Sequence, residues 1–231
     1  MRYCSISPLK DHVVIDWQAF KLWGIRANAS CGVVLTAPHC SLRCEPVTTG
    51  QMDDALSSGG IDLAMGYCPN LNALGIMSEK LFLHSLFCLV RANHPQVRSS
   101  HVTLDTLLEL QHAVVHSVGR SNELFETLLR TRKLRRKVTL LSSHVLSLSA
   151  IIASADLIVT VPRSLAEYYV GIDNLRMVEP PINIQPYEIS QFCHGRFDGD
   201  PAVKWLRTYV ANLHQEKRSR SRAASGKGAR S

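Results

Sequence analysis

The chain has 231 residues, of which 45% are hydrophobic and 19% charged, as is ordinary for a globular protein with a sizeable core. No apolar run reaches the roughly 18 residues of a membrane-spanning helix, and Lys10, Asp11 and Asp16 interrupt any apolar core of a signal peptide. Seven cysteines without a framework spacing suit a reducing compartment. The totals therefore exclude a membrane span and predict a cytoplasmic protein with no membrane partner.

The net charge of +7 is unevenly distributed along the sequence. Residues 217–231 contain six basic residues and no acid, which leaves 7 − 6 = +1 for the rest of the chain. A Ser/Gly/Arg-rich composition of this kind predicts a solvated, disordered tail over residues 216–231 rather than a dedicated binding arm. Such a tail can still contact phosphates weakly and without sequence preference.

Strands and helices alternate from residue 42 onward. Apolar and β-branched runs predict strands over residues 42–47, 61–66, 79–91 (one or two strands, broken near 84–85), 112–116, 137–141, 157–161, 175–179 and 187–193. Capping residues and apolar stripes predict helices over residues 50–58, 104–110, 121–133, 144–154, from 162, and from 201. This alternation predicts mainly parallel sheets in two lobes, with a crossing near residues 90–93 and a return near 186–189.

Several short motifs follow one another in a family-specific order. They are Gly60-Ile61-Asp62-Leu63-Ala64-Met65-Gly66, Arg91-Ala92-Asn93-His94-Pro95, Val102 to Leu107, Ser154 to Arg163, and Phe192 to Phe197 with Asp200-Pro201 and Trp205-Leu206-Arg207. In this order and spacing the sequence resembles the LysR-type transcriptional regulators over roughly residues 42–215. The closing segment is similar to that of the branch that regulates aromatic degradation and nodulation.

The resemblance implies an effector-binding domain of two Rossmann-like α/β lobes, the type II periplasmic-binding-protein fold. Residues 42–92 plus 188–215 would form the first lobe and residues 93–187 the second. A small inducer, an aromatic acid or related anion, would bind in the cleft between the lobes and control transcription. The resemblance also implies a homo-oligomer (dimer or tetramer), DNA as a partner through the family role, and no cofactor.

Residues 1–41 depart from the family pattern. They show neither the winged helix-turn-helix and linker helix nor the opening strand and first helix of the effector domain, although Val13-Val14-Ile15 is compatible with a strand. The sequence therefore predicts an atypical segment fused to a truncated domain, and it puts direct, specific DNA binding by this chain in doubt.

Effector-contacting residues are expected at the carboxyl ends of strands, where helix N-termini offer free N–H groups. Four corners have suitable side chains: Thr49, Tyr67, Arg120, and Ser142-Ser143-His144, with Phe192 as a further ring. His144 falls where this branch has a histidine that contacts the effector, and the alternative is that it only caps its own helix. Arg120 could pair with a carboxylate or be a surface residue, and Tyr67 and Phe192 could line the site or belong to the core.

The sequence gives no support for an enzyme or a metal protein. Cys31, His39, Cys40 and Cys44 are close in sequence, but no second paired cluster completes a zinc site. No nucleophile elbow, dinucleotide fingerprint or phosphate-binding Gly-Lys-Ser/Thr loop occurs. Two alternatives to a regulator remain open: a solute-binding protein of the same fold, which the missing signal peptide disfavours, and a non-functional remnant with an incomplete first lobe.

Overall fold

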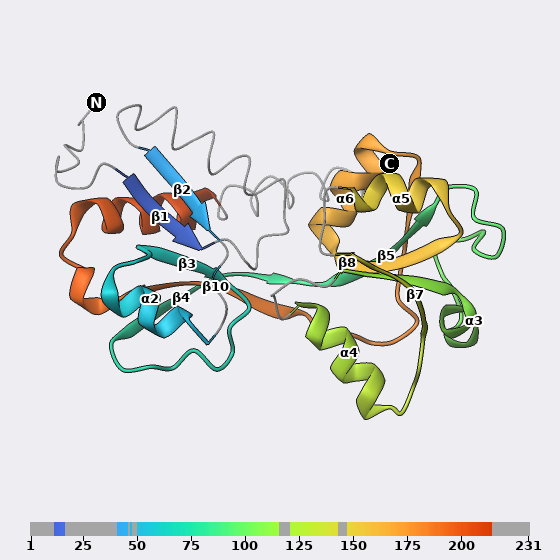
Figure 1. Ribbon diagram of the computed structural model, residues 1–231, viewed down its shortest axis with the longest axis horizontal. Helices are drawn as coiled ribbons and strands as arrows, with labels where there is room; N and C mark the ends of the chain where they lie inside the picture. Colours follow the sequence, from blue (N-terminus) through green and yellow to red (C-terminus); the bar gives the residue numbers. More distant parts are fainter. Residues whose placement is uncertain are drawn as a thin grey trace, which may run out of the picture. The chain divides into compact units, whose positions relative to one another are not determined.

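A computed structural model describes residues 12–16, 41–45, 47, 50–115, 121–142 and 147–213, with the backbone alone at residues 12–16, 41–45, 121 and 122. The chain divides into two compact units, and residues 83–188 form the second, here called unit 2. The described residues up to Phe82 and from Ile189 belong to unit 1. Each unit is built around one five-stranded sheet (Figure 1).

The sheet of unit 1 has the strand order β2-β1-β3-β10-β4. The elements of this unit are β1 (His12–Asp16), β2 (Ser41–Glu45), α2 (Met52–Ser58), β3 (Leu63–Gly66), β4 (Ile76–His84), β10 (Tyr187–His194), the 3₁₀ turn η1 (Gly195–Phe197) and a helix over residues 201–213. β1 pairs in parallel with β2 and β3, whereas β10 is antiparallel to β3. The predicted absence of a first-lobe strand within residues 1–41 is therefore wrong at residues 12–16.

The core of unit 1 lies on both faces of this sheet. Phe192 packs with Met52 and Leu56 of α2 on one face. The neighbouring Gln191 is 1% exposed and donates a hydrogen bond to the backbone oxygen of Arg207 in the C-terminal helix. Because successive strand residues point to opposite faces, α2 covers one face of the sheet and the C-terminal helix the other.

The sheet of unit 2 has the order β7-β6-β8-β5-β9. Its elements are β5 (Leu86–Arg91), α3 (Leu104–Glu109), β6 (Gln111–Val115), α4 (Ser121–Thr131), β7 (Lys137–Ser142), α5 (Leu148–Ser154), β8 (Leu157–Pro162), α6 (Arg163–Ile172) and β9 (Leu175–Val178). β7, β6 and β8 are parallel, whereas β5 is antiparallel to both β8 and β9. Both sheets are therefore mixed rather than mainly parallel.

The chain crosses from unit 1 to unit 2 between Phe82 and Leu83, within β4, and not at the predicted residues 90–93. The reason is the position of β5, which lies between β8 and β9 in the second sheet. Its residues Cys88, Leu89 and Val90 are fully buried there. The apolar run over residues 79–91 is thus two strands interrupted at Ser85, as the sequence allowed, but the crossing precedes that interruption.

Two helix starts confirm predictions from capping residues. Thr103 accepts a hydrogen bond from the backbone nitrogen of Thr106 at the start of α3. The Asp200 carboxylate accepts one from the backbone nitrogen of Ala202 at the start of the C-terminal helix, at 2.8 Å. In both cases the side chain replaces the missing intrahelical partner of a first-turn N–H group.

Gly59 ends α2 in a conformation that a larger residue disfavours. Its φ is +77°, and a Cβ atom there would lie 2.8 Å from Cζ of Phe197. We expect Gly59→Ala to lower the free energy of unfolding by about 1–2 kcal/mol, measured by urea denaturation. Gly171 in α6 is the contrasting site, because nothing lies within 4 Å of a Cβ there. Gly171→Ala should stabilise by about 0.5 kcal/mol, and a loss of similar size in both variants would contradict this account.

Candidate functional site

Three parallel strands of unit 2 end at one edge of its sheet, here called the carboxyl edge. β6 ends at Val115, β7 at Ser142 and β8 at Pro162, and Val115 is the register partner of Ser142. Each strand is followed in the chain by a helix, α4, α5 or α6. The first N–H groups of a helix lack intrahelical partners and carry partial positive charge, so an edge of this kind suits an anion.

The predicted second-lobe residues belong to segments that leave this edge. Ser142 is the last residue of β7 and is partly buried. Arg120, Ser143 and His144 lie outside the described residues. The structure therefore brings together the strands that precede residues 120 and 143, and the contacts of these three side chains stay predictions.

The helix expected from about residue 144 begins later than predicted. α5 starts at Leu148 and its N-cap is Ser147, whose side chain makes no capping hydrogen bond. Apolar periodicity alone overestimates such a helix, because periodicity does not define where the first turn forms. Ser147 therefore precedes the helix, and residues 143–146 lie outside the described residues.

A polar cluster that sequence reasoning missed lies beside the carboxyl edge. Because β5 is antiparallel to β8, Leu86 is the register partner of Pro162, and the preceding His84 reaches the same edge. Nε2 of His84 lies 3.3 Å from Oγ of Ser164 in α6. The rings of His84 and Tyr187 lie 5.5 Å apart, centroid to centroid. The only sequence signal for this cluster is the His-Ser pair that interrupts an apolar run.

Burial keeps the polar cluster neutral. His84 is 8% exposed, and desolvation, followed by the positive charge of Arg163, lowers the pKa of its imidazole to about 4. Burial also raises the pKa of the Tyr187 phenol above its usual value. At neutral pH the cluster thus consists of an uncharged imidazole and two hydroxyl groups, Ser164 and Tyr187, and adds no net charge to the edge.

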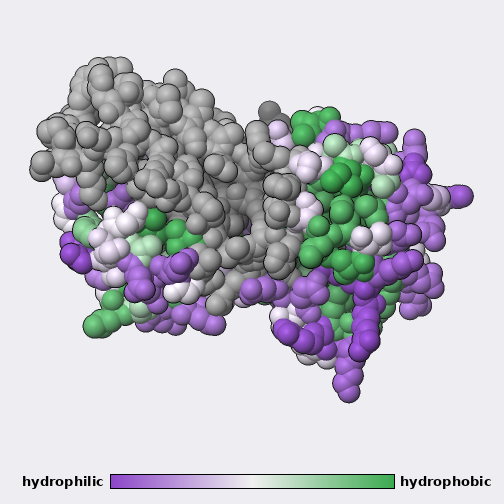
Figure 2. Space-filling model, viewed as in Figure 1, coloured by the Kyte–Doolittle hydropathy of each residue, from purple (hydrophilic) through white to green (hydrophobic). Residues whose placement is uncertain are grey.

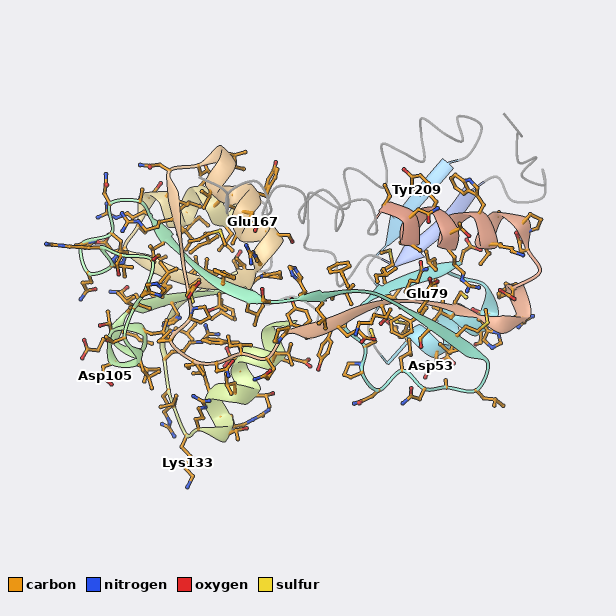
Figure 3. All side chains as sticks on the ribbon, turned by 180° about the vertical axis from the view of Figure 1, so that it is seen from behind. Asp53, Glu79, Asp105, Lys133, Glu167 and Tyr209 are labelled. Carbon is orange, nitrogen blue, oxygen red and sulfur yellow. The ribbon has the colours of Figure 1, made fainter. Side chains whose placement is uncertain are left out.

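Arg163 is the cation of this region. Its backbone nitrogen donates a hydrogen bond to the Ser85 oxygen at 2.9 Å, which ties the first residue of α6 to the β4–β5 connection. Its guanidinium lies 5.3 Å from the centroid of the Phe87 ring, and its Nε lies 2.8 Å from a carboxylate oxygen of Glu167 (labelled in Figure 3). The pair is about half exposed, so it contributes little to stability and leaves the guanidinium open to exchange partners.

In unit 1 the predicted residues have different surroundings. Thr49 lies outside the described residues. Tyr67 directly follows β3 and is partly buried, at an end shared by parallel strands β1 and β2. Phe192 is 5% exposed within the apolar core against α2. Of the two aromatic candidates, Tyr67 thus keeps a position from which it can contact a ligand, whereas Phe192 packs in the core.

His194 and Arg196 of the closing segment have structural contacts in unit 1. Nδ1 of His194 accepts a hydrogen bond from the backbone nitrogen of Arg196 at 3.1 Å, which caps η1. The Arg196 guanidinium donates to the Ser57 oxygen at 2.6 Å, at the end of α2. Both residues therefore stabilise the closure of this unit.

Two of the described cysteines, Cys88 and Cys193, are buried, and Cys68 is partly buried. Cys88 is fully buried, and desolvation raises the pKa of its thiol to about 11, so it is protonated at neutral pH. Among the residues that the structure describes, no three His, Cys, Asp or Glu side chains are grouped to hold a metal ion. Cys31, His39 and Cys40 lie outside this part of the chain, as does the side chain of Cys44. In the same part of the chain, no helix has the length and apolar character needed to cross a membrane.

Comparison with known proteins identifies the family. Residues 35–215 match the family model of the LysR substrate binding domain. The transcriptional activator NagR of a Ralstonia species is 29% identical over 180 residues, which cover 78% of this chain and 59% of NagR. The regulator SyrM of Rhizobium etli is 32% identical over 178 residues, 76% of this chain and 51% of SyrM. The chain thus spans little more than half the length of these relatives.

Solved structures share the fold. A transcriptional regulator of Vibrio parahaemolyticus superimposes with a TM-score of 0.77 at 25% identity, over 91% of this chain and 96% of that one. The regulatory domain of CcmR from Synechocystis, solved in complex with 2-PG, has a TM-score of 0.72 at 10% identity, over 88% and 96% of the two chains. These matches confirm the predicted fold class. Because its residues 35–215 match the family model, the chain belongs to the LysR family as an effector-binding regulatory domain.

Proposed function

We propose that the carboxyl edge of unit 2 binds a small aromatic anion as the effector. The observation that carries this proposal is the convergence at one edge of the ends of β6, β7 and β8 with the neutral cluster of His84, Ser164 and Tyr187. The helix starts supply N–H donors for a carboxylate. The rings of His84 and Tyr187, 8% and 5% exposed, lie behind these helix starts and give the edge an apolar backing rather than an open surface.

The chemistry of the edge favours an anion over a cation. The carboxylate of Glu167, near the polar cluster, is already paired with Arg163. A carboxylate effector could replace Glu167 as the partner of Arg163, because an exposed arginine–carboxylate pair costs little to exchange. The predicted contacts of Ser142, Ser143, His144, Arg120, Tyr67 and Thr49, and the predicted position of the effector between two lobes, remain part of the proposal.

Regulation then follows from differential affinity. A ligand that binds one arrangement of the domain more tightly shifts the population toward it, and the shift cannot exceed the difference in binding free energy. Control of transcription by this chain, DNA contact through the family role and a dimeric or tetrameric state stay predictions. Light scattering of the full chain would test the oligomeric state.

A thermal-shift screen of the full chain tests the effector proposal. Benzoate and hydroxybenzoates should raise the melting temperature, whereas acetate should not. At a concentration 100 times Kd the bound anion adds about 2.7 kcal/mol to stability. Ser164→Ala and His144→Ala should each raise the Kd of the effector about tenfold, as expected for one lost hydrogen bond to a charged group.

Ser154→Ala is the matched control, because Ser154 ends α5 and its hydroxyl only contacts the Ala150 oxygen. That variant should keep the full shift. A shift that survives both Ser164→Ala and His144→Ala would place the ligand elsewhere. A chain that melts without cooperativity would instead support the remnant interpretation.

A further inference from the structure

The connection between α4 and β7 concentrates positive charge at the end of unit 2 remote from the carboxyl edge. Residues 130–137 contain six basic residues and no acid. The whole chain has +7 and the tail +6, so removing both segments leaves 7 − 6 − 6 = −5 for the remainder. Outside the tail, positive charge is therefore concentrated in residues 130–137 and the rest is net negative, although the two sum to only +1.

One of the six cations is structural and five are exposed. Arg136 is 6% exposed at its side chain, forms an ion pair with Glu126 and lies 5.0 Å from the centroid of the Phe125 ring. The others we call the basic patch, namely Arg130, Arg132, Lys133, Arg135 and Lys137, all of them exposed. No carboxylate in the described part of the chain forms an ion pair with any of these five. Its neighbour Leu134 is partly buried, whereas Val138, directly after Lys137, is 51% exposed.

Lys133 stands at the tip of the connection and points away from the sheet (Figure 3). The space-filling view shows hydrophilic side chains at this end of unit 2 (Figure 2). Two backbone hydrogen bonds end α4, from Lys133 to the Arg130 oxygen and from Leu134 to the Leu129 oxygen. They place Lys133 at φ +55°, in the left-handed position where helices prefer glycine. The chain thus has a lysine where stability alone favours glycine.

The basic patch is separate from the proposed effector site. Lys137 begins β7 and Ser142 ends it. Five residues of strand separate the two by roughly 16 Å. The patch therefore lies at the amino end of the strand whose carboxyl end carries the candidate site, and one small anion cannot contact both.

We propose that the basic patch binds the phosphate backbone of duplex DNA. Seven residues of chain reach at most about 24 Å. Duplex DNA carries one charge per roughly 1.7 Å of helix axis, so several phosphates lie within reach of five cations. Exposed cations that form no ion pair with a described carboxylate suit a contact with phosphates that positions the protein and reads no sequence. The chain belongs to a family of transcription regulators, so DNA is the polyanion that we expect it to encounter.

Fluorescence anisotropy with a 30-base-pair duplex of random sequence tests this surface. The full chain carries Lys217→Ser, Arg218→Ser, Arg220→Ser and Arg222→Ser, so that DNA binding by the tail does not hide the contribution of the basic patch. The double variant Arg132→Glu and Arg135→Glu should weaken binding at least tenfold and reduce the slope of log K against log salt by about 2. The matched double variant Arg98→Glu and Lys204→Glu changes net charge equally at exposed sites outside the patch, and should change affinity less than threefold.

Lys133→Gly separates binding from folding. It should raise the melting temperature by about 2–4 °C, because glycine adopts the left-handed conformation without strain. It should nevertheless lower the affinity for DNA, and reduce the slope of log K against log salt by about 1. Equal losses in the patch and control doubles would overturn the proposal, since net charge would then suffice. Binding to poly-glutamate but not DNA would overturn it in favour of an acidic protein partner. Both outcomes are measured without an effector, so they test the basic patch separately from the proposed effector site.

Discussion

Acidification from pH 7 to pH 4 is expected to lower the free energy of unfolding of unit 2 by about 3 kcal/mol for each of two buried histidines, His84 and His112. Burial lowers the pKa of both imidazoles from 6.5 to about 4. One pKa unit corresponds to about 1.4 kcal/mol. A total loss of about 6 kcal/mol approaches the whole stability of an ordinary domain, so unit 2 should unfold near pH 4.

The sign follows from which state binds the proton. The unfolded histidine is protonated below pH 6.5, whereas the folded one stays neutral down to about pH 4. The stabilising contribution is therefore complete above pH 6.5, is lost as pH falls through the window to pH 4, and then stays constant. Urea denaturation followed by circular dichroism at pH 7, 6, 5 and 4 measures this loss.

The contacts of His112 explain why its neutral form is required. Its Nε2 lies 2.8 Å from the Leu107 oxygen and its Nδ1 3.4 Å from the Arg136 guanidinium. Arginine only donates, so Nδ1 accepts and Nε2–H donates to the carbonyl. A second proton on Nδ1 would replace this acceptor with a cation facing Arg136. His112→Asn should cost stability at pH 7 but remove about half of the pH dependence, and an unchanged slope in this variant would contradict the assignment.

Phe192→Ala is expected to lower the free energy of unfolding by about 3–5 kcal/mol, with or without an effector. The ring is 5% exposed and packs against Met52 and Leu56 of α2 and against Ile61. Truncation removes this buried apolar area and leaves a cavity that the sheet and helix cannot fully close. Urea denaturation at pH 7 gives the loss directly.

The matched variant Phe192→Leu separates a core role from the ligand-contacting role that the sequence left open. Leucine retains most of the buried volume and should cost only about 1–2 kcal/mol. The effector-induced thermal shift should then be unchanged. A Phe192→Leu protein of nearly normal stability that no longer responds to the effector would restore Phe192 to the binding site.

Local features of the fold were predictable from the residues that form them. Thr103 and Asp200 cap helices through partners only two or three positions away, so residue type and spacing sufficed. The break at His84-Ser85 between two apolar runs was visible for the same reason. Membership of a regulator family also confirms the expectation that this chain is not an enzyme.

Features that depend on distant partners were not predictable. Val13-Val14-Ile15 was compatible with a strand, but the place of β1 in the sheet comes from pairing with residues 41–45 and 63–64. His84 is noteworthy only because antiparallel β5 brings it to Ser164, eighty positions away. The basic patch was overlooked because a sum of charges does not show where they gather.

The sequence by itself determined the family, the succession of strands and helices and the caps, because these depend on local spacing and on motif order. Only the tertiary structure decided which way each strand runs, which side chains meet at the carboxyl edge and which aromatic residue is buried in the core. These properties depend on register and burial between segments far apart in the chain.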